Sequence, residues 1–115
     1  MKTGIDIVDV DRFKNLSEDK LAKIFTENEI NYCCSFSDKQ THFAGHFSAK
    51  EAFVKAIRLG FGKGLTPIDI EISHDKNGVP FIIKSNKIKQ FINNEEIELS
   101  ISHTKKTAIA ICILY

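Results

Sequence analysis

The chain has neither an excess of one charge nor an apolar run long enough to cross a membrane. Its 16 basic and 15 acidic residues leave a net charge of +1, so the overall charge gives no reason to expect binding to nucleic acid or to a membrane surface. Any basic patch must therefore be local. The first residues show no basic segment followed by an apolar stretch, and no apolar run approaches 18 residues.

The chain is also poor in cysteine, with three residues of which Cys33 and Cys34 are adjacent. An odd number with an adjacent pair forms neither a disulfide framework nor a zinc pattern. Together with the missing targeting and membrane segments, this predicts a reduced, soluble protein in the cytoplasm.

What the chain does have is a large apolar fraction for its length. Its 115 residues are 43% hydrophobic and include nine Phe, which is enough for a real core in one domain, residues 1–115. Strand-like and helix-like patterns follow one another in the order β, α, α, α, β, β, α, β, β. This order predicts an α+β domain with a mostly antiparallel sheet packed on helices.

Local signals place these elements. Ser17 and the Thr26–Glu29 capping box each predict the start of a helix, and Asn77-Gly78 predicts a hairpin turn. The nearly continuous apolar run 108–115 predicts a strand covered on both faces, by a helix or by another subunit. The expected strands are 4–10, 68–73, 79–83, 97–103 and 108–115, and the expected helices begin at Ser17 and Thr26 or span 47–57 and 86–92.

The segment 47–57 has the clearest helical period. One apolar stripe contrasts with a face that carries Glu51 and Lys55, four residues apart. A solvent-facing ion pair is the simple interpretation of these two residues. Phe47 and Val54 flank the charged face, however, and favour a helix covered on both sides with the charges partly buried. The stripe itself consists of Ala49, Ala52, Phe53, Ala56 and Ile57.

Three further features have both a structural and a functional interpretation. Asp6 within a strand is either solvated or held for a cation. Gly60, Gly62 and Gly64 stop a helix or, with Lys63 beside them, approach a phosphate. His103 at a strand end either packs there or belongs to a site.

Combined, these features suggest phosphoryl chemistry. Two carboxylates from different elements, Asp6 and Glu51, suit a Mg²⁺ ion that keeps several waters beside a phosphorylated substrate. A lysine next to them, Lys55, suits charge that develops on a transferring phosphoryl group.

Three segments then carry a resemblance to a known family: GIDIV at 4–8, FSAKEAFVKA at 47–56 and SISHT at 100–104. Their order and spacing, and the length of the chain, resemble holo-(acyl-carrier-protein) synthase, the small bacterial type of 4′-phosphopantetheinyl transferase. The resemblance covers essentially the whole chain. It implies the 4′-phosphopantetheinyl transferase-like fold.

The resemblance also implies an activity that supports fatty acid biosynthesis. Such enzymes transfer the 4′-phosphopantetheine group of coenzyme A to a serine of apo acyl carrier protein and release adenosine 3′,5′-bisphosphate. By the same resemblance, Asp6 and Glu51 hold magnesium and Lys55 contacts the reacting phosphate. The proton acceptor stays open among a metal-linked water, Asp6 and Glu51.

The remaining implied roles concern binding. His103, Gly60, Gly62 and Lys63 match positions that approach coenzyme A. His46 stands where many family members have arginine, so it is expected to hold a phosphate only when protonated.

Partners are implied as well. Arg12 matches a basic residue facing the acidic carrier protein, and Lys20 and Lys23 extend that patch. A homotrimer with sites at subunit interfaces is expected. The competing hypotheses are a coenzyme A- or nucleotide-binding module without turnover, and a structural oligomer whose charges are merely surface.

Overall fold

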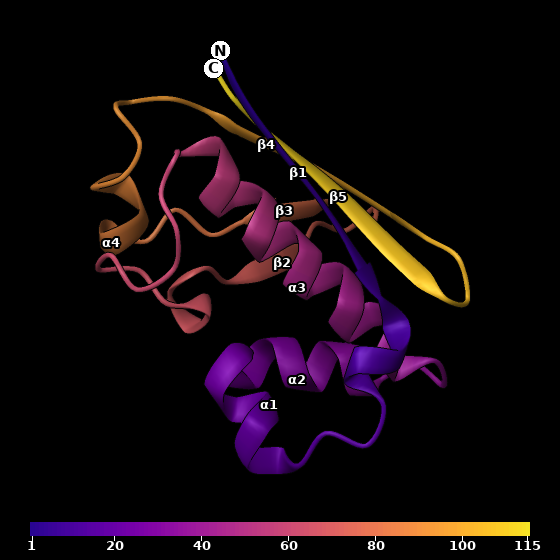
Figure 1. Ribbon diagram of the computed structural model, residues 1–115. Coiled ribbons are helices and arrows are strands. Elements are labelled where there is room, and N and C mark those ends of the chain that lie inside the picture. The colour runs from indigo at the N-terminus through magenta and orange to yellow at the C-terminus, as the bar shows by residue number, and fades with distance from the viewer.

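The computed structural model describes residues 1–115, which form helices packed on antiparallel strands (Figure 1). None of the helices combines the length and apolarity that a membrane crossing requires. In chain order the elements are β1 (Lys2–Asp9), the 3₁₀ helix η1 (Val10–Phe13), α1 (Glu18–Ile24), α2 (Glu27–Cys34), α3 (Lys39–Ala56), the 3₁₀ helix η2 (Pro67–Asp69), β2 (Ile72–His74), β3 (Pro80–Ile82), α4 (Asn86–Lys89), β4 (Ile97–His103) and β5 (Thr107–Leu114).

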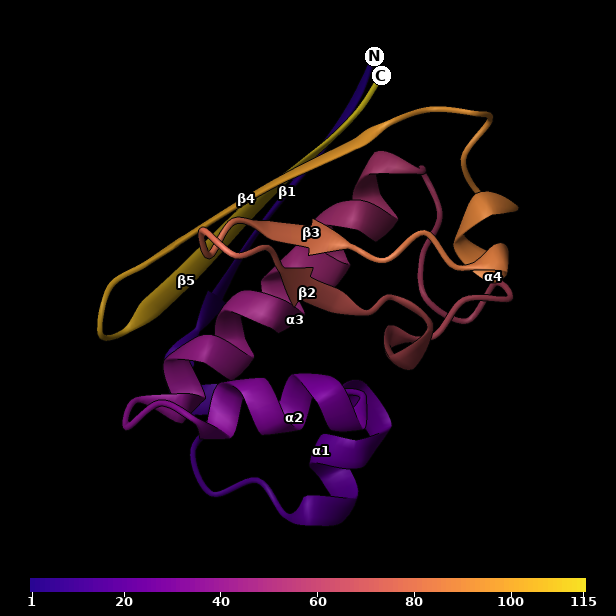
Figure 2. The same ribbon diagram turned by 180° about the vertical axis from the view of Figure 1, so that it is seen from behind.

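Helix α3 is the centre of the molecule. The three-stranded antiparallel sheet β1-β5-β4 lies on one side of it, and the β2–β3 hairpin lies on the other (Figures 1 and 2). Its stripe of Ala49, Ala52, Phe53 and Ala56 is fully buried. Val54, on the other side of the helix, is 3% exposed, which confirms that α3 is covered on both sides.

Close packing of β1 on α3 depends on Gly4. A Cβ at this position would lie 1.9 Å from the carbonyl oxygen of Ala52. Since this contact is with helix backbone, no side-chain movement relieves it. The glycine therefore sets how near the strand comes to the helix, and with it the position of Asp6 two residues further on.

A second apolar cluster joins α1, α2 and η1 to the first half of α3. The Phe25 ring lies 4.9 Å from that of Phe43 and 6.0 Å from that of Phe13, centre to centre. Ser17 and Thr26 cap α1 and α2 as expected, and Thr26 forms the complete capping box with Glu29.

The outer face of the three-stranded sheet is open. Along β5, Ala108, Ala110 and Cys112 are buried under α3, whereas Ile109 and Ile111 point away and are 36% and 38% exposed. On β1, Ile5 and Ile7 are 57% and 67% exposed on the same side. The chain by itself thus covers only one of the two faces of β5.

The sequence-based predictions of secondary structure differ most from the structure at two places. The expected strand 68–73 is β-structure only from Ile72, because Pro67 and the Thr66–Asp69 capping box start the short helix η2 instead. Helix α3 begins at Lys39, well before the predicted 47, and its left-handed C-terminal residue is Arg58, with φ 64°, rather than a glycine.

Candidate functional site

Asp6 faces α3 from the middle of β1. Strand alternation puts Gly4, Asp6 and Val8 on the helix side of the sheet and the isoleucines on the other. The Ser48 hydroxyl donates a hydrogen bond of 2.9 Å to the Asp6 main-chain carbonyl, which ties the strand to α3 at this position. The Asp6 carboxylate is consequently held in place and is 13% exposed.

Lys55 reaches from α3 to the same strand. Its ammonium group donates to Asp6 Oδ1 at 3.1 Å and to the main-chain carbonyl of Ile5 at 3.0 Å. The lysine side chain remains 52% exposed, so the positive charge faces the solvent-accessible edge of the pair.

Glu51 completes this group from one turn earlier in α3. Partial burial raises the pKa of its carboxyl, and the nearby Asp6 carboxylate raises it further, while Lys55 and Arg12 act in the opposite direction. No hydrogen bond or ion pair of the structure uses the Glu51 carboxylate. Two carboxylates and a lysine therefore converge from β1 and α3.

The donor set at this place fits a hard divalent cation with few protein ligands. The structure has no cluster of three or more His, Cys, Asp or Glu side chains arranged to hold a metal ion. Mg²⁺ does not need one, because it is commonly held by one or two carboxylates together with water and substrate phosphates. Asp6 and Glu51 are residues that meet this requirement.

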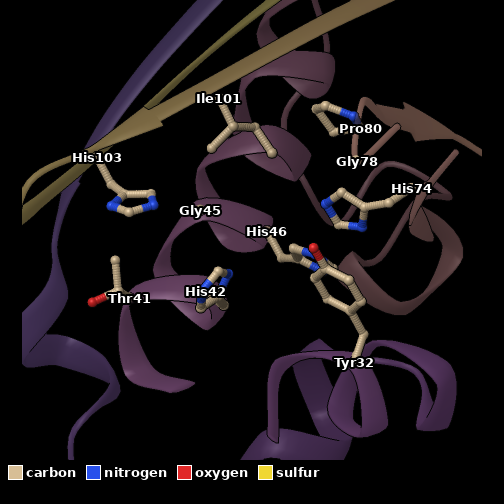
Figure 3. Close-up of a pocket in the computed structure, with 10 residues that line it drawn as sticks. All are labelled: Tyr32, Thr41, His42, Gly45, His46, His74, Gly78, Pro80, Ile101 and His103. Carbon is tan, nitrogen blue, oxygen red and sulfur yellow. The ribbon is translucent and has the colours of Figure 1, made fainter. Parts of the chain in front are cut away.

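A separate cavity of about 170 Å³ lies between α2, the first half of α3, the β2–β3 hairpin and the end of β4 (Figure 3). All four histidines of the chain line it, although they come from three elements. Tyr32 stacks on His74, with ring centres 4.0 Å apart. The lining residues are Tyr32, Thr41, His42, Gly45, His46, His74, Gly78, Pro80, Ile101 and His103.

Behind this cavity lies a buried charged network that the sequence did not reveal. Glu29 and Lys50 are both 0% exposed, and the Lys50 ammonium lies 2.6 Å from Glu29 Oε1. Lys50 also donates to the main-chain carbonyls of Ile24 and Pro67, at 2.8 and 2.9 Å. The other Glu29 oxygen, Oε2, lies 2.9 Å from Nδ1 of His46.

The expected coenzyme A-binding residues fall into two groups. His46 and His103 line the cavity at the N-terminal half of α3. Gly60, Gly62 and Lys63 follow the C-terminal end of the same helix. Helix rise separates the Cα atoms of residues 46 and 56 by about 15 Å along the axis, so the two groups lie well apart along α3.

The basic residues expected to face a carrier protein are exposed. Arg12 lies on η1 with its guanidinium 5.0 Å from the centre of the Phe47 ring, and it is close enough to Glu51 to lower the pKa of that carboxyl. Lys20 and Lys23 lie on α1.

Residues 2–112 match the family described as the 4′-phosphopantetheinyl transferase superfamily. The chain belongs to this superfamily. Named relatives agree. It is 41% identical to a holo-(acyl-carrier-protein) synthase of Caldicellulosiruptor saccharolyticus over 115 residues, covering 96% of this chain and 92% of that one. It is 36% identical to the synthase of Protochlamydia amoebophila over 114 residues, with 96% and 93% covered.

Solved structures place the fold in the same superfamily. The holo-(acyl-carrier-protein) synthase of Helicobacter pylori in complex with coenzyme A superposes with a TM-score of 0.85 at 34% identity, covering 98% of this chain and 99% of that one. The Bacillus anthracis enzyme in complex with coenzyme A (3′,5′-ADP) gives 0.84 at 36% identity, with 98% and 94% covered. The predicted α+β transferase fold is thereby confirmed.

Proposed function

We propose that the chain transfers the 4′-phosphopantetheine group of coenzyme A to a serine of apo acyl carrier protein. The convergence of Asp6, Glu51 and Lys55 is the observation that supports this most directly, since it brings two carboxylates and one ammonium to a single place. The superfamily membership and the coenzyme A complexes of the relatives supply the substrate class. Residues 1–115 form a single transferase domain in this proposal.

The reaction moves one phosphorus centre between two oxygens. The serine oxygen bonds to the phosphorus that carries the pantetheine arm, and the bond from that phosphorus to the bridging pyrophosphate oxygen breaks. Adenosine 3′,5′-bisphosphate leaves with the bonding electrons. The serine proton passes to a metal-linked water, to Asp6 or to Glu51.

The residues around this centre act through charge and position. Asp6 and Glu51 would hold Mg²⁺, which when bound neutralises pyrophosphate charge. Lys55 is positioned beside them to stabilise negative charge on the transferring group and on the leaving bisphosphate. Ser48 and Gly4 keep the strand and the helix at the separation that this arrangement needs.

Coenzyme A binding is assigned to His46, His103, Lys55, Gly60, Gly62 and Lys63. The glycine loop and the histidine cavity lie well apart along α3, and in this proposal a second copy supplies one of the two groups to each site. The open apolar face of β1 and β5 provides a surface for that copy. These two observations support a homotrimer with sites between subunits.

The carrier protein would approach the exposed Arg12, which neighbours the carboxylates, with Lys20 and Lys23 as a more distant extension of the basic surface. A local basic patch would allow a chain of almost zero net charge to bind an acidic partner. All three cysteines are free, in keeping with the predicted cytoplasmic location.

Intact mass spectrometry of a bacterial apo acyl carrier protein tests this function. The carrier is incubated with the protein, coenzyme A and Mg²⁺, and a mass gain of one phosphopantetheine group is expected on the carrier alone. Coenzyme A binding without any mass gain on several carriers would instead support a binding module without turnover.

A further inference from the structure

Helix α3 ends in a left-handed residue that is not glycine. Arg58, with φ 64°, directly follows the C-terminal residue Ile57. The Arg58 main-chain N–H donates to the carbonyl of Lys55 at 3.1 Å, and the Leu59 N–H donates to that of Val54 at 3.2 Å. These two bonds form a complete Schellman motif, in which the left-handed position is usually glycine. A side chain at this position costs conformational energy, because its Cβ crowds the following carbonyl.

Arg58 is also unusual among the left-handed residues of this chain. Apart from glycines, the only others with positive φ are Asn15 and Asn94, at 60° and 59°. Asparagine tolerates the conformation because its short polar side chain bonds to nearby backbone. Arginine has no such compensation. Strained backbone conformations are found preferentially at active sites and ligand contacts, so the side chain of Arg58 calls for a role.

The contact that Arg58 makes within the chain does not explain the strain. Arg58 is exposed, and its Nη1 lies 3.5 Å from the main-chain carbonyl of Thr3, at the outer limit for a hydrogen bond. Water would satisfy an exposed carbonyl equally well. The helix dipole favours a cation at this end, but Lys55 already supplies one in the last turn. The guanidinium therefore keeps most of its N–H donors for a ligand.

Arg58 and Lys55 lie along the same open edge of a strand. The C-terminal end of α3 lies beside β1, which pairs with β5 only, so the other edge of β1 is unpaired (Figures 1 and 2). Lys55 donates to the carbonyl of Ile5, and Arg58 approaches that of Thr3. Carbonyls two residues apart in a strand point the same way and lie about 7 Å apart. The two cations consequently stand side by side, with Asp6 next to the first.

We propose that Arg58 is a second cationic contact, beside Lys55, for the pyrophosphate of coenzyme A. This inference rests on the proposed function, in which Lys55 contacts the reacting phosphate. The lysine ammonium is a point charge, whereas a guanidinium presents a planar fork of donors that matches two oxygens of a phosphate. Each cation then serves one of two adjacent phosphates. Arg58 binds and orients the substrate and takes no part in proton transfer.

Two variants distinguish this role from a purely structural one. Arg58→Ala and Arg58→Gly both remove the guanidinium, but only glycine relieves the left-handed strain. Arg58→Gly should therefore unfold at a higher urea concentration than Arg58→Ala. If Arg58 served only the fold, coenzyme A affinity would follow the same order. Because the guanidinium itself binds the ligand in this proposal, both variants should lose affinity to the same extent.

Calorimetric titration with coenzyme A in the presence of Mg²⁺ measures that affinity. Losing a hydrogen bond to a charged group should weaken binding at least about tenfold in both variants. Arg58→Lys, which keeps the charge without the fork, should lie between them and wild type. Wild-type affinity in Arg58→Gly would overturn the proposal and leave the transferase function untouched. Equal urea midpoints of the alanine and glycine variants would contradict the strain on which the inference depends.

Dephospho-coenzyme A identifies the phosphate that Arg58 contacts, since it lacks the ribose 3′-phosphate and keeps the pyrophosphate. The fold loss of affinity in Arg58→Gly should be the same for both ligands. A loss that disappears with dephospho-coenzyme A would assign Arg58 to the 3′-phosphate and overturn the proposal. Asn15→Gly, at the left-handed position between η1 and α1, is the control and should leave the affinity for both ligands unchanged.

Discussion

Lys55 and Asp6 lie 49 positions apart in the chain, yet the lysine ammonium is 3.1 Å from Asp6 Oδ1. This contact joins the middle of β1 to the last turn of α3. Glu51, one turn earlier on the helix, then lies beside the same carboxylate. The close approach of strand and helix at Gly4 is what makes this meeting possible.

The first prediction concerns Lys55. Lys55→Met should lower the rate of phosphopantetheine transfer roughly 10²–10³-fold, the typical effect of losing one group that stabilises developing charge. Its side chain is 52% exposed, so unfolding free energy should change by less than about 1 kcal/mol. Transfer kinetics and urea unfolding check both parts, and a rate equal to that of wild type would contradict the assigned role.

Substitution of Lys50, on the same helix, should instead reduce the stability of the fold. Lys50→Met leaves the Glu29 carboxylate buried without its cation, and removing one partner of such a pair costs about 3–5 kcal/mol. Urea unfolding measures the loss, and Lys55→Met is the matched control.

The double variant Glu29→Leu/Lys50→Met distinguishes the effect of the buried charges on stability from the effect of side-chain packing. Because it removes both buried charges, it should be more stable than Lys50→Met alone. A double variant less stable than the single one would show that Lys50 acts through packing rather than as the partner of Glu29.

Gly4 provides a test of the strand–helix distance. Gly4→Ala should cost about 3 kcal/mol or more, since the new Cβ meets backbone that has no room to move. Gly60→Ala is the control, because nothing lies within 4 Å of a Cβ there. Its effect should stay within about 0.5 kcal/mol. Equal unfolding free energies of the two variants would refute this account of the packing.

Acid should weaken the fold through Glu29. Burial raises the pKa of this carboxyl, but its hydrogen bonds to His46 and Lys50 and their charges outweigh burial and leave the pKa below the ordinary value of 4.5. A lowered native pKa stabilises the fold above pH 4.5, and this contribution is lost as the pH falls through the native value.

The measurement is urea unfolding of wild type and Glu29→Gln from neutral pH downward. The difference in unfolding free energy between the two proteins should be constant above pH 4.5 and shrink below it. A difference that grows on acidification would have the wrong sign for this linkage.

The open face of the sheet predicts an oligomer. Ile7→Glu places a charge on a side chain that is 67% exposed in the single chain, so the fold should persist while the proposed trimer should dissociate. Ile68→Glu, at a position in η2 that is 37% exposed, is the control and should leave the molecular mass of the assembly unchanged. Sedimentation analysis measures the oligomeric state of both variants. A trimer that stays intact in Ile7→Glu would show that the interface lies elsewhere.

Much of the fold was visible in the sequence because local signals are strong there. Strand 97–103 was predicted with the bounds of β4, and the Thr26 capping box and the Asp75–Gly78 turn lie where their residues indicate. The first half of α3 was missed because residues 39–46 have no regular apolar stripe. Tertiary packing on both sides, rather than periodicity, buries Thr41 and His46 there.

The site was predictable only in part. Asp6, Glu51 and Lys55 were identified by their motif segments, and their convergence follows from the fold. Glu29 and Lys50 were not, because a glutamate in a capping box and a lysine in a helix are ordinarily surface residues. The gathering of the four histidines likewise depends on tertiary structure, since only His42 and His46 are close in sequence.

The most direct test of the account measures phosphopantetheine transfer against Mg²⁺ concentration for wild type, Asp6→Asn and Glu51→Gln. If these two carboxylates hold the ion, wild type loses activity when a chelator removes the metal. Each variant should then have a lower maximal rate than wild type and should require much more Mg²⁺ to reach it. Variants that keep both the wild-type rate and the wild-type Mg²⁺ requirement would contradict the account.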